Sequence, residues 1–246
     1  MAGTFDGTIT WVGHGTFLLE AAGQRILIDA FVDNCPTTPD RLKGEGLGHL
    51  DAILLTHGHM DHVADIAAHQ GRTGAKVAGM VELIDWLGGT GVDAEHLVDF
   101  GIGGTIELGG GIEVTMTYAR HSSSVPNGSY AGTPTGFVIA LPGGFTIYHS
   151  GDTDVFGDMA LIRELHEPDL AILSIGGHYT MGPKGAAKAV ELLGVRHVIG
   201  GHFGTFPPLA GTPQALRELV APLGVHVHVL EPGDSLDGAA VAAVGA

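Results

Sequence analysis

The segment Leu54–Asp65 reads LLTHGHMDHVAD and places His57, His59, Asp61 and His62 within six positions. Neutral imidazoles and carboxylates are the ligands that zinc and similar divalent metals prefer. His57 and His59 alternate directly after an apolar run, which predicts a loop that leaves a strand and directs both rings at one ion. Asp61 and His62 begin a predicted helix, so they are free to face a second ion. This dense pattern predicts part of a metal centre rather than a solvated histidine-rich loop.

The remaining ligands must come from elsewhere, because four side chains are too few for two metals with an open coordination position. Three candidates each stand just past a predicted strand: His121 in TMTYARHSSS, Asp152 in TIYHSGDTDVF and His202 in HVIGGHFGTFP. They share one position relative to their strands. We therefore expect the fold to gather them at one edge, beside the histidine motif.

The elements that must position these residues are strands with interspersed helices. Apolar runs and alternation predict strands or hairpins over 8–20, 24–30, 50–56, 105–120, 135–152, 169–176 and 197–201. Helical patterns cover 61–70, 81–87, 158–167, 183–194 and 212–223. The mixture predicts an α/β or α+β class. We expect one domain over 1–246, because no Pro/Ser-rich linker divides the chain.

The two halves of the chain echo each other. GQRILIDAFVD followed by LDAILLTHGHMDH is similar to GGFTIYHSGDTDVF followed by PDLAILSIGGHYTMGP. Each stretch indicates a hairpin, a strand ending in an Asp turn, and a buried strand ending in a Gly/His loop. We interpret the echo as two half-units, roughly 1–120 and 121–246, that face one another with their active loops at a shared edge.

Composition narrows the class of partner. Lys plus Arg is 11 and Asp plus Glu is 27, which gives a formal charge of -16. A surface this acidic argues against nucleic acid or an anionic membrane as partner, whereas a small-molecule substrate remains compatible. The chain begins without a signal-type segment, no run approaches the ~18–20 apolar residues of a membrane span, and Cys35 is the sole cysteine. We expect a cytoplasmic protein, and composition leaves a homo-oligomer open.

The ordered set THGHMDH, RHSSS, SGDT and GHFGTFP resembles the metallo-β-lactamase superfamily over essentially the whole chain. More narrowly, WVGHGTFLLE, HSGDT, GGHYTMGP and GHFGTFP are similar to its cytoplasmic metal-dependent hydrolases, a branch related to the ascorbate-6-phosphate lactonases. The resemblance implies a four-layer αβ/βα sandwich of two mixed β-sheets flanked by helices. It also implies a ligand set: His57, His59 and His121 for one metal, Asp61, His62 and His202 for the other, and Asp152 bridging them.

The chemistry implied is hydrolysis at two divalent metals, with zinc as the first expectation and manganese, nickel or iron as alternatives. Two metals ~3.5–4 Å apart share a water, lower its pKa toward ~7 and present hydroxide at neutral pH. Asp61 is the candidate to orient that hydroxide and pass its proton. We expect the substrate to contain a small ester, lactone or related bond.

Two alternative functions stay open at this point. One is a phosphodiesterase acting on a nucleotide or phospholipid-like substrate, for which the candidate cations are few: Arg120, Lys184 and Arg196. The other belongs to a different class, a non-catalytic metal-binding or sensing module.

Several histidines lie outside the ligand set. His178 in GGHYTMGP ends a strand that mirrors the one before His57, so we expect it to face the cleft and to bind substrate or protonate the leaving group. His14 in WVGHGTF is open between a structural hydrogen bond, support of a metal ligand and substrate contact. His149 in YHSGD is predicted to pack in the core. Seven more are predicted to be mostly surface or packing residues: His49, His69, His96, His166, His197, His226 and His228.

Overall fold

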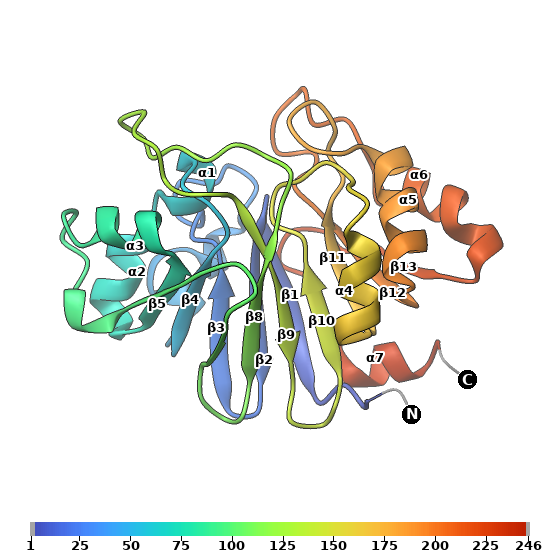
Figure 1. Cartoon of the computed structure of the whole chain (residues 1–246), viewed down its shortest axis with the longest axis horizontal. Coiled ribbons are helices and arrows are strands. Elements are labelled where there is room, and N and C mark those ends of the chain that lie inside the picture. The colour runs from blue at the N-terminus through green and yellow to red at the C-terminus, as the bar shows by residue number, and fades with distance from the viewer. Residues whose placement is uncertain (1–2, 245–246) are drawn as a thin grey trace.

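The structure is a computed structural model that describes residues 3–244, and two seven-stranded sheets face each other at its centre (Figure 1). The first sheet has the order β14-β1-β2-β3-β4-β5-β6, and the second has the order β13-β12-β11-β10-β9-β8-β7. The first sheet contains β1 (Gly7–Gly13), β2 (Thr16–Ala21), β3 (Gln24–Ile28), β4 (Ala52–Leu55), β5 (Lys76–Met80), β6 (Leu97–Phe100) and β14 (Ser235–Asp237). The second contains β7 (Thr105–Glu107), β8 (Glu113–Tyr118), β9 (Thr135–Ala140), β10 (Thr146–His149), β11 (Leu170–Ser174), β12 (His197–Gly201) and β13 (His226–His228).

Helices cover the outer side of each sheet, so the chain forms the four-layer αβ/βα sandwich that the sequence predicted (Figure 1). On the side of the first sheet lie α1 (Met60–Val63), α2 (Ile66–Thr73) and α3 (Val81–Leu87). On the side of the second lie α4 (Met159–His166), α5 (Pro183–Leu193) and α6 (Pro213–Val220), and α7 (Gly238–Ala242) lies near the chain ends. Short 3₁₀ turns occur at Asp40–Leu42, Gly44–Leu47, Ala94–His96 and Ala221–Leu223.

The two sheets share one strand pattern. In the first, β1, β2 and β3 pair antiparallel, and β3, β4, β5 and β6 then pair parallel. In the second, β7 to β10 pair antiparallel and β10 to β13 pair parallel. Parallel strands end at the same edge, so the loops that follow β4, β10 and β12 reach one end of the sandwich.

The common strand pattern supports our proposal that the halves are duplicates, but the sheets do not divide near residue 120. The chain passes from one sheet to the other between β6 and β7, at residues 101–104, and β14 returns from the C-terminal part to the first sheet. Sequence similarity between buried strands indicates the repeat, whereas the partner of each edge strand depends on contacts far along the chain.

The helix predicted over 61–70 is divided into α1 and α2. At the break, the backbone N–H of Asp65 donates to the carbonyl of Ala30, and its carboxylate accepts from the N–H of Val32 at 2.7 Å. These long-range bonds replace helical ones at that position. The strands β5, β6, β13 and β14 and the helix α7 were not predicted, because segments of three to five residues give little periodic signal.

The core between the sheets is built from large apolar side chains of both sheets. Trp11 and Phe17 on the first and Phe137 on the second are each at most 1% exposed. A second apolar cluster fills the space between the second sheet and α4, α5 and α6. Burial on both faces makes the strands a rigid base for the loops at their ends.

Candidate metal centre

The first donor group joins His57, His59 and His121, whose ligand atoms lie within 4.8 Å of one another. His57 follows β4 and is buried, and its Nε2 lies 2.9 Å from Nδ1 of His59. His121 comes from the loop after β8, and its ring centroid lies 5.1 Å from each of the other two ring centroids. The structure thus brings His121 to His57 and His59, which lie more than sixty positions before it in the sequence.

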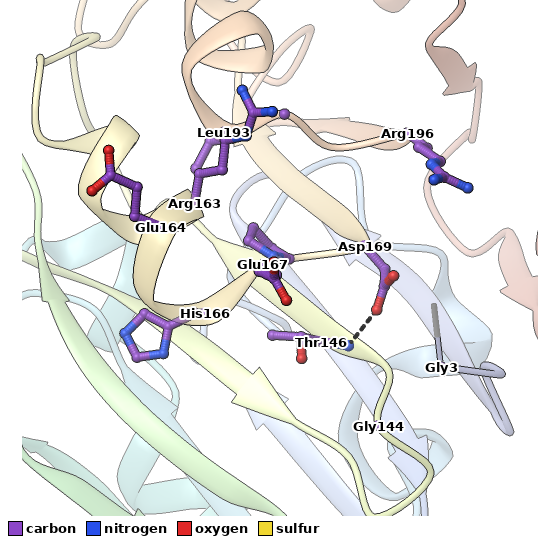
Figure 2. A pocket seen from close by; sticks show the side chains of 12 residues that line it. Gly3, Gly144, Thr146, Arg163, Glu164, His166, Glu167, Asp169, Leu193 and Arg196 are labelled. Carbon is purple, nitrogen blue, oxygen red and sulfur yellow. Dashed lines mark hydrogen bonds between the residues drawn. The ribbon is translucent and has the colours of Figure 1, made fainter. Parts of the chain in front are cut away.

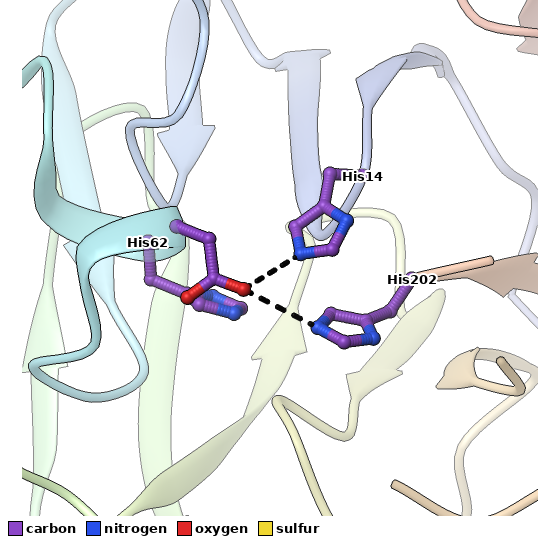
Figure 3. Close-up of side chains that lie close together, drawn as sticks. His14, His62 and His202 are labelled. Carbon is purple, nitrogen blue, oxygen red and sulfur yellow. Dashed lines mark hydrogen bonds and ion pairs between the residues drawn. The ribbon is translucent and has the colours of Figure 1, made fainter. Parts of the chain in front are cut away.

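The second donor group contains Asp61, His62 and His202, and the structure adds His14 to them. Asp61 and His62 lie on α1, and His202 directly follows β12. The Oδ2 atom of Asp61 is 2.9 Å from Nε2 of His14 and 3.8 Å from Nε2 of His202. Figure 3 shows both rings directed at this carboxylate. Of the roles that the sequence left open for His14, the structure shows a hydrogen bond to Asp61, and His14 is also one of the candidate donors.

Asp152 lies between the two groups. It follows β10 and is 4% exposed. Its Oδ2 atom lies 3.0 Å from Nε2 of His202, 3.5 Å from Nε2 of His62 and 3.8 Å from Nε2 of His121. One carboxylate oxygen therefore faces histidines of both donor groups, as a bridging ligand must.

The donor set fits divalent metal ions. Within the described part of the chain, the Nε2 atom of His62 is buried without a hydrogen-bond partner, 3.5 Å from Oδ2 of Asp152. Buried polar atoms are normally satisfied, so a buried ring nitrogen that faces a carboxylate without bonding to it fits a metal ligand. Imidazole nitrogens and carboxylate oxygens in this arrangement are ligands suited to zinc and its neighbours among divalent metals.

A buried hydrogen-bond network fixes the orientation of the histidines from behind. Asp29, which follows β3, accepts from Nδ1 of His62 at 2.7 Å through Oδ2. The hydroxyl of Thr56 donates to the same Oδ2 at 2.8 Å and lies 3.0 Å from Nδ1 of His57. With Nδ1 of both rings engaged, their Nε2 atoms are the ones left to face an ion. Sequence reasoning missed Asp29 and Thr56 as supporting residues; the Asp at the end of ILID, echoed by the Asp of HSGD, was the available signal.

Close backbone approaches hold the ligand-bearing loops. A Cβ atom at Gly176 would lie 2.0 Å from the carbonyl oxygen of His202. Gly151, which precedes Asp152, has φ +57°, and a Cβ atom there would lie 2.2 Å from the carbonyl oxygen of Thr135. Only glycine fits these two positions without moving the neighbouring backbone.

Electrostatics keep the carboxylates ionised. Burial alone would raise the pKa of Asp152, but His202 and His62 outweigh it and hold that pKa well below the usual value. Burial also opposes ionisation of Asp61, and the hydrogen bonds from His14 and His202 lower its pKa nevertheless. Both side chains are therefore anionic at neutral pH.

The histidines divide according to whether burial or the nearby carboxylates have the larger effect on their pKa. Burial lowers the pKa of His57 well below 6.5 and that of His14 to about 4, so both are neutral near pH 7. For His202, burial lowers the pKa, but the charge of Asp152 prevails and raises it to about 9. A bound cation would have to displace this proton, since only neutral imidazole ligates a metal.

A cavity of about 450 Å³ opens over the donor groups. Its lining combines side chains of both donor groups with apolar and aromatic residues from two loops. Among the residues that the structure describes, its lining contains neither lysine nor arginine. The complete lining is His14, His59, Asp61, His121, Ser122, Asp152, Tyr179, His202, Phe206, Pro208 and Leu209.

His178 does not lie where the sequence predicted. Its side chain is exposed and is absent from the lining of this cavity, whereas its neighbour Tyr179 lines it. After β11 the backbone turns through positive φ at Gly177 (73°) and His178 (61°). The rings of His178 and Tyr179 stand at 88° to each other. Strand alternation cannot be extrapolated through such a turn. The structure therefore places Tyr179 rather than His178 in the lining of this cavity, and a catalytic role of His178 stays a prediction.

The other histidines mostly lie as expected. His149 is 4% exposed and accepts from the N–H of Gly151 through Nδ1, so it packs in the core. His197 and His228 stack at the outer edge of the second sheet, with 3.1 Å between their ring nitrogens. Neither belongs to the donor groups: His197 lies at the start of β12, four residues before that strand ends beside His202, and His228 lies on the neighbouring β13.

A larger cavity, of about 710 Å³, lies at the opposite end of the second sheet (Figure 2). It is lined from the start of β10 and β11, by residues that include Thr146, Asp169, Arg163 and Arg196. The groups of residues suited to a metal, sought within residues 3–244, all lie at the other end. In the same range, no helix is long and apolar enough to cross a membrane.

Comparisons with known proteins extend over nearly the whole chain. A family model described as a beta-lactamase superfamily domain matches residues 24–203. A UPF0173 metal-dependent hydrolase of Herpetosiphon aurantiacus is 47% identical over 234 residues, which cover 93% of this chain and 96% of that protein. Another, of Methanosarcina mazei, is 43% identical over 235 residues, 94% of this chain and 98% of the relative.

Solved structures agree with the fold. Igni18, a metallo hydrolase from the archaeon Ignicoccus hospitalis, superposes with a TM-score of 0.84 at 33% identity, covering 94% of this chain and 97% of its own. An isothiocyanate hydrolase from Delia radicum gut bacteria has a TM-score of 0.71 at 19% identity, covering 93% and 98%, and at this identity the likeness concerns the fold alone.

Proposed function

We propose a reaction for this chain, which belongs to the beta-lactamase superfamily and is one of its UPF0173 metal-dependent hydrolases. The proposed reaction is cleavage of an ester, lactone or related bond of a small molecule at two divalent metal ions. The observation that carries the proposal is the convergence of two donor groups on the buried carboxylate of Asp152. His57, His59 and His121 would hold one ion, and Asp61, His62 and His202 the other, with Asp152 between them.

Bound ions of this kind polarise the scissile carbonyl and lower the pKa of an attacking water. The residues of the chain contribute orientation and proton handling. Asp61 lines the cavity with its side chain 33% exposed, and its Oδ2 is fixed by His14. A carboxylate held in one orientation at the cavity wall can align the attacking water and accept a hydrogen bond from it. His14, buried behind it, keeps that orientation while substrate enters.

The cavity lining favours a substrate with an uncharged ester or lactone group over one with an anionic phosphodiester. Phosphate recognition commonly uses arginine or lysine, and the described lining contains neither. Of the cations considered from the sequence, Arg120 is 63% exposed and lies 3.6 Å from Asp154, and Arg196 lines the remote cavity. The formal charge of -16 further disfavours approach of an anionic substrate.

Metal analysis combined with a substrate panel tests this function. The protein is loaded with Zn, Mn or Ni and assayed on p-nitrophenyl esters, lactones, thioesters and bis-p-nitrophenyl phosphate. Two metals per chain with ester or lactone turnover supports the proposal. Turnover of the phosphodiester alone would favour phosphodiesterase activity. Less than one metal per chain with no turnover of any substrate would favour a non-catalytic binding module.

Replacement of Asp152 tests the ligand assignment. Asp152→Ala removes the one oxygen that faces both donor groups, and losing one partner of a buried charged cluster typically costs about 3–5 kcal/mol. We therefore expect metal affinity to fall by at least about a hundredfold, with loss of hydrolysis. Asp154→Ala is the matched control, because Asp154 is two residues away but has a side chain 55% exposed and pairs only with Arg120 among the ion pairs described. An Asp152→Ala protein that keeps both metals and its turnover would refute the assignment.

A further inference from the structure

Part of the cavity lining is apolar or aromatic. Tyr179, Phe206, Pro208 and Leu209 form this part, which we call the apolar wall. They come from two loops, one after β11 and one after β12. At about 450 Å³ the cavity is within the range of small-molecule sites, and it is larger than a scissile group alone requires.

The loop after β12 gives the apolar wall a fixed shape. The N–H of Leu209 donates to the carbonyl of Phe206 at 2.9 Å, and the N–H of Gly204 donates to the carbonyl of Leu209 at 2.9 Å. Leu209 is 2% exposed and anchors the turn, while Phe206 remains 37% exposed. The Phe206 ring lies 5.5 Å from the His14 ring, so the wall begins directly beside the donor groups.

The loop after β11 supplies the second aromatic ring. Tyr179 is 60% exposed although its loop is tied to the site: the N–H of Met181 donates to the carbonyl of Thr153, next to Asp152. Large aromatic surfaces that stay exposed together beside a cavity mark a binding site more often than isolated exposed rings do. Aromatic side chains lose little conformational entropy when they bind a ligand, which suits them to this task.

We infer that the substrate carries an uncharged apolar group, an acyl chain or a ring, that packs between Tyr179 and Phe206 while its scissile bond lies against the donor groups. This inference rests on the proposed function, because the apolar wall belongs to the same cavity. It defines the substrate class more narrowly: apolar esters or lactones are bound in preference to acidic ones. An acidic group placed among Tyr179, Phe206 and Leu209, away from the donor groups, would meet neither lysine nor arginine in the described lining.

The inference is tested by binding as well as by turnover. A series of straight-chain hydroxamic acids from acetyl to octanoyl is titrated calorimetrically into the metal-loaded protein, and p-nitrophenyl esters of the same acids are assayed. Burying a methylene contributes ~0.8 kcal/mol, so we expect Kd to improve up to about fourfold per methylene until the wall is covered. The kcat/KM of the esters should rise in parallel.

Variants test whether the apolar wall causes the dependence of Kd on chain length. Phe206→Ala and Tyr179→Ala should each flatten the dependence of Kd on chain length, with folding checked by thermal unfolding. Tyr130→Ala is the control, because Tyr130 is 68% exposed and is not part of the cavity lining, so its series should match that of the unmodified protein.

The outcomes separate the two proposals. A flat series, or tighter binding of a succinyl than of a butyryl hydroxamate, would overturn the apolar substrate class even if esters are hydrolysed. A steep series that Phe206→Ala flattens would support the class even if none of the esters is turned over, and in that case the proposed reaction would be at fault.

Discussion

Replacement of His14 isolates one hydrogen bond of the proposed metal centre. Two variants are needed, because His14 is fully buried and also has a positive φ of 51°, and each variant preserves one of these features. His14→Phe keeps a ring between Phe31 and Phe206, whose centroids lie 5.6 and 5.5 Å from that of His14. His14→Asn keeps a residue that tolerates positive φ. Both remove the 2.9 Å bond to Asp61.

The expected size of the effect follows from that bond. A hydrogen bond to an ionised group contributes about 1.5–3 kcal/mol. Asp61 is anionic, and without His14 its carboxylate is no longer fixed from behind. At about 1.4 kcal/mol per factor of ten, we expect both variants to lose about tenfold to hundredfold in affinity for the metal at Asp61, and a similar factor in kcat/KM. Residues that support metal ligands generally show losses of this size.

Metal affinity is measured by competition with a chromophoric chelator, kcat/KM with a p-nitrophenyl ester, and stability by urea unfolding of the metal-free protein. His228→Phe serves as a matched control, because His228 is 7% exposed but lies on the edge strand β13. It should alter stability without altering metal affinity. If both His14 variants bind metal within twofold of the unmodified protein, the positioning role argued for His14 is wrong.

Two further predictions concern glycine substitutions and the pH dependence of stability. Gly176→Ala should destabilise the fold by more than about 1 kcal/mol and weaken metal binding, since its Cβ would lie 2.0 Å from the carbonyl oxygen of His202. Gly71→Ala is the control: Gly71 lies on a helix, a Cβ there would meet nothing within 4 Å, and the variant should be more stable by about 0.5–1 kcal/mol in urea unfolding. Burial, reinforced by His226 and His197, lowers the pKa of His228 from 6.5 to about 4. The folded state therefore resists protonation of His228. The contribution of His228 to the free energy of unfolding is complete above pH 6.5 and falls by at most about 3 kcal/mol as the pH drops toward 4. His228→Phe should remove this share of the stability loss between pH 7 and 4.5, measured by urea unfolding of the variant and of the unmodified protein, both metal-free. An equal loss in the two proteins would contradict the pKa argued for His228.

The sequence alone predicted an α/β or α+β class and the residues that converge at one edge, and its resemblance to a known family implied the sandwich. His57 and His59 follow an apolar strand, and His121, Asp152 and His202 occupy the same place after theirs. These signals are local: an apolar run sets a buried strand, and the next residues must lie at its end. The strand order then brings those ends together, which is why their proximity could be predicted without coordinates.

Only the tertiary structure decided the remaining features, because each depends on contacts between distant segments. The bond between His14 and Asp61 joins residues 47 positions apart, and the bond between Asp29 and His62 joins residues 33 apart. Whether Tyr179 or His178 faces the cavity depends on two successive residues with positive φ, and strand periodicity does not extend through such a turn. A chain pattern specifies which residues reach the edge of a sheet; the direction of each side chain there is set by the backbone of the loop and by the partners that the fold supplies.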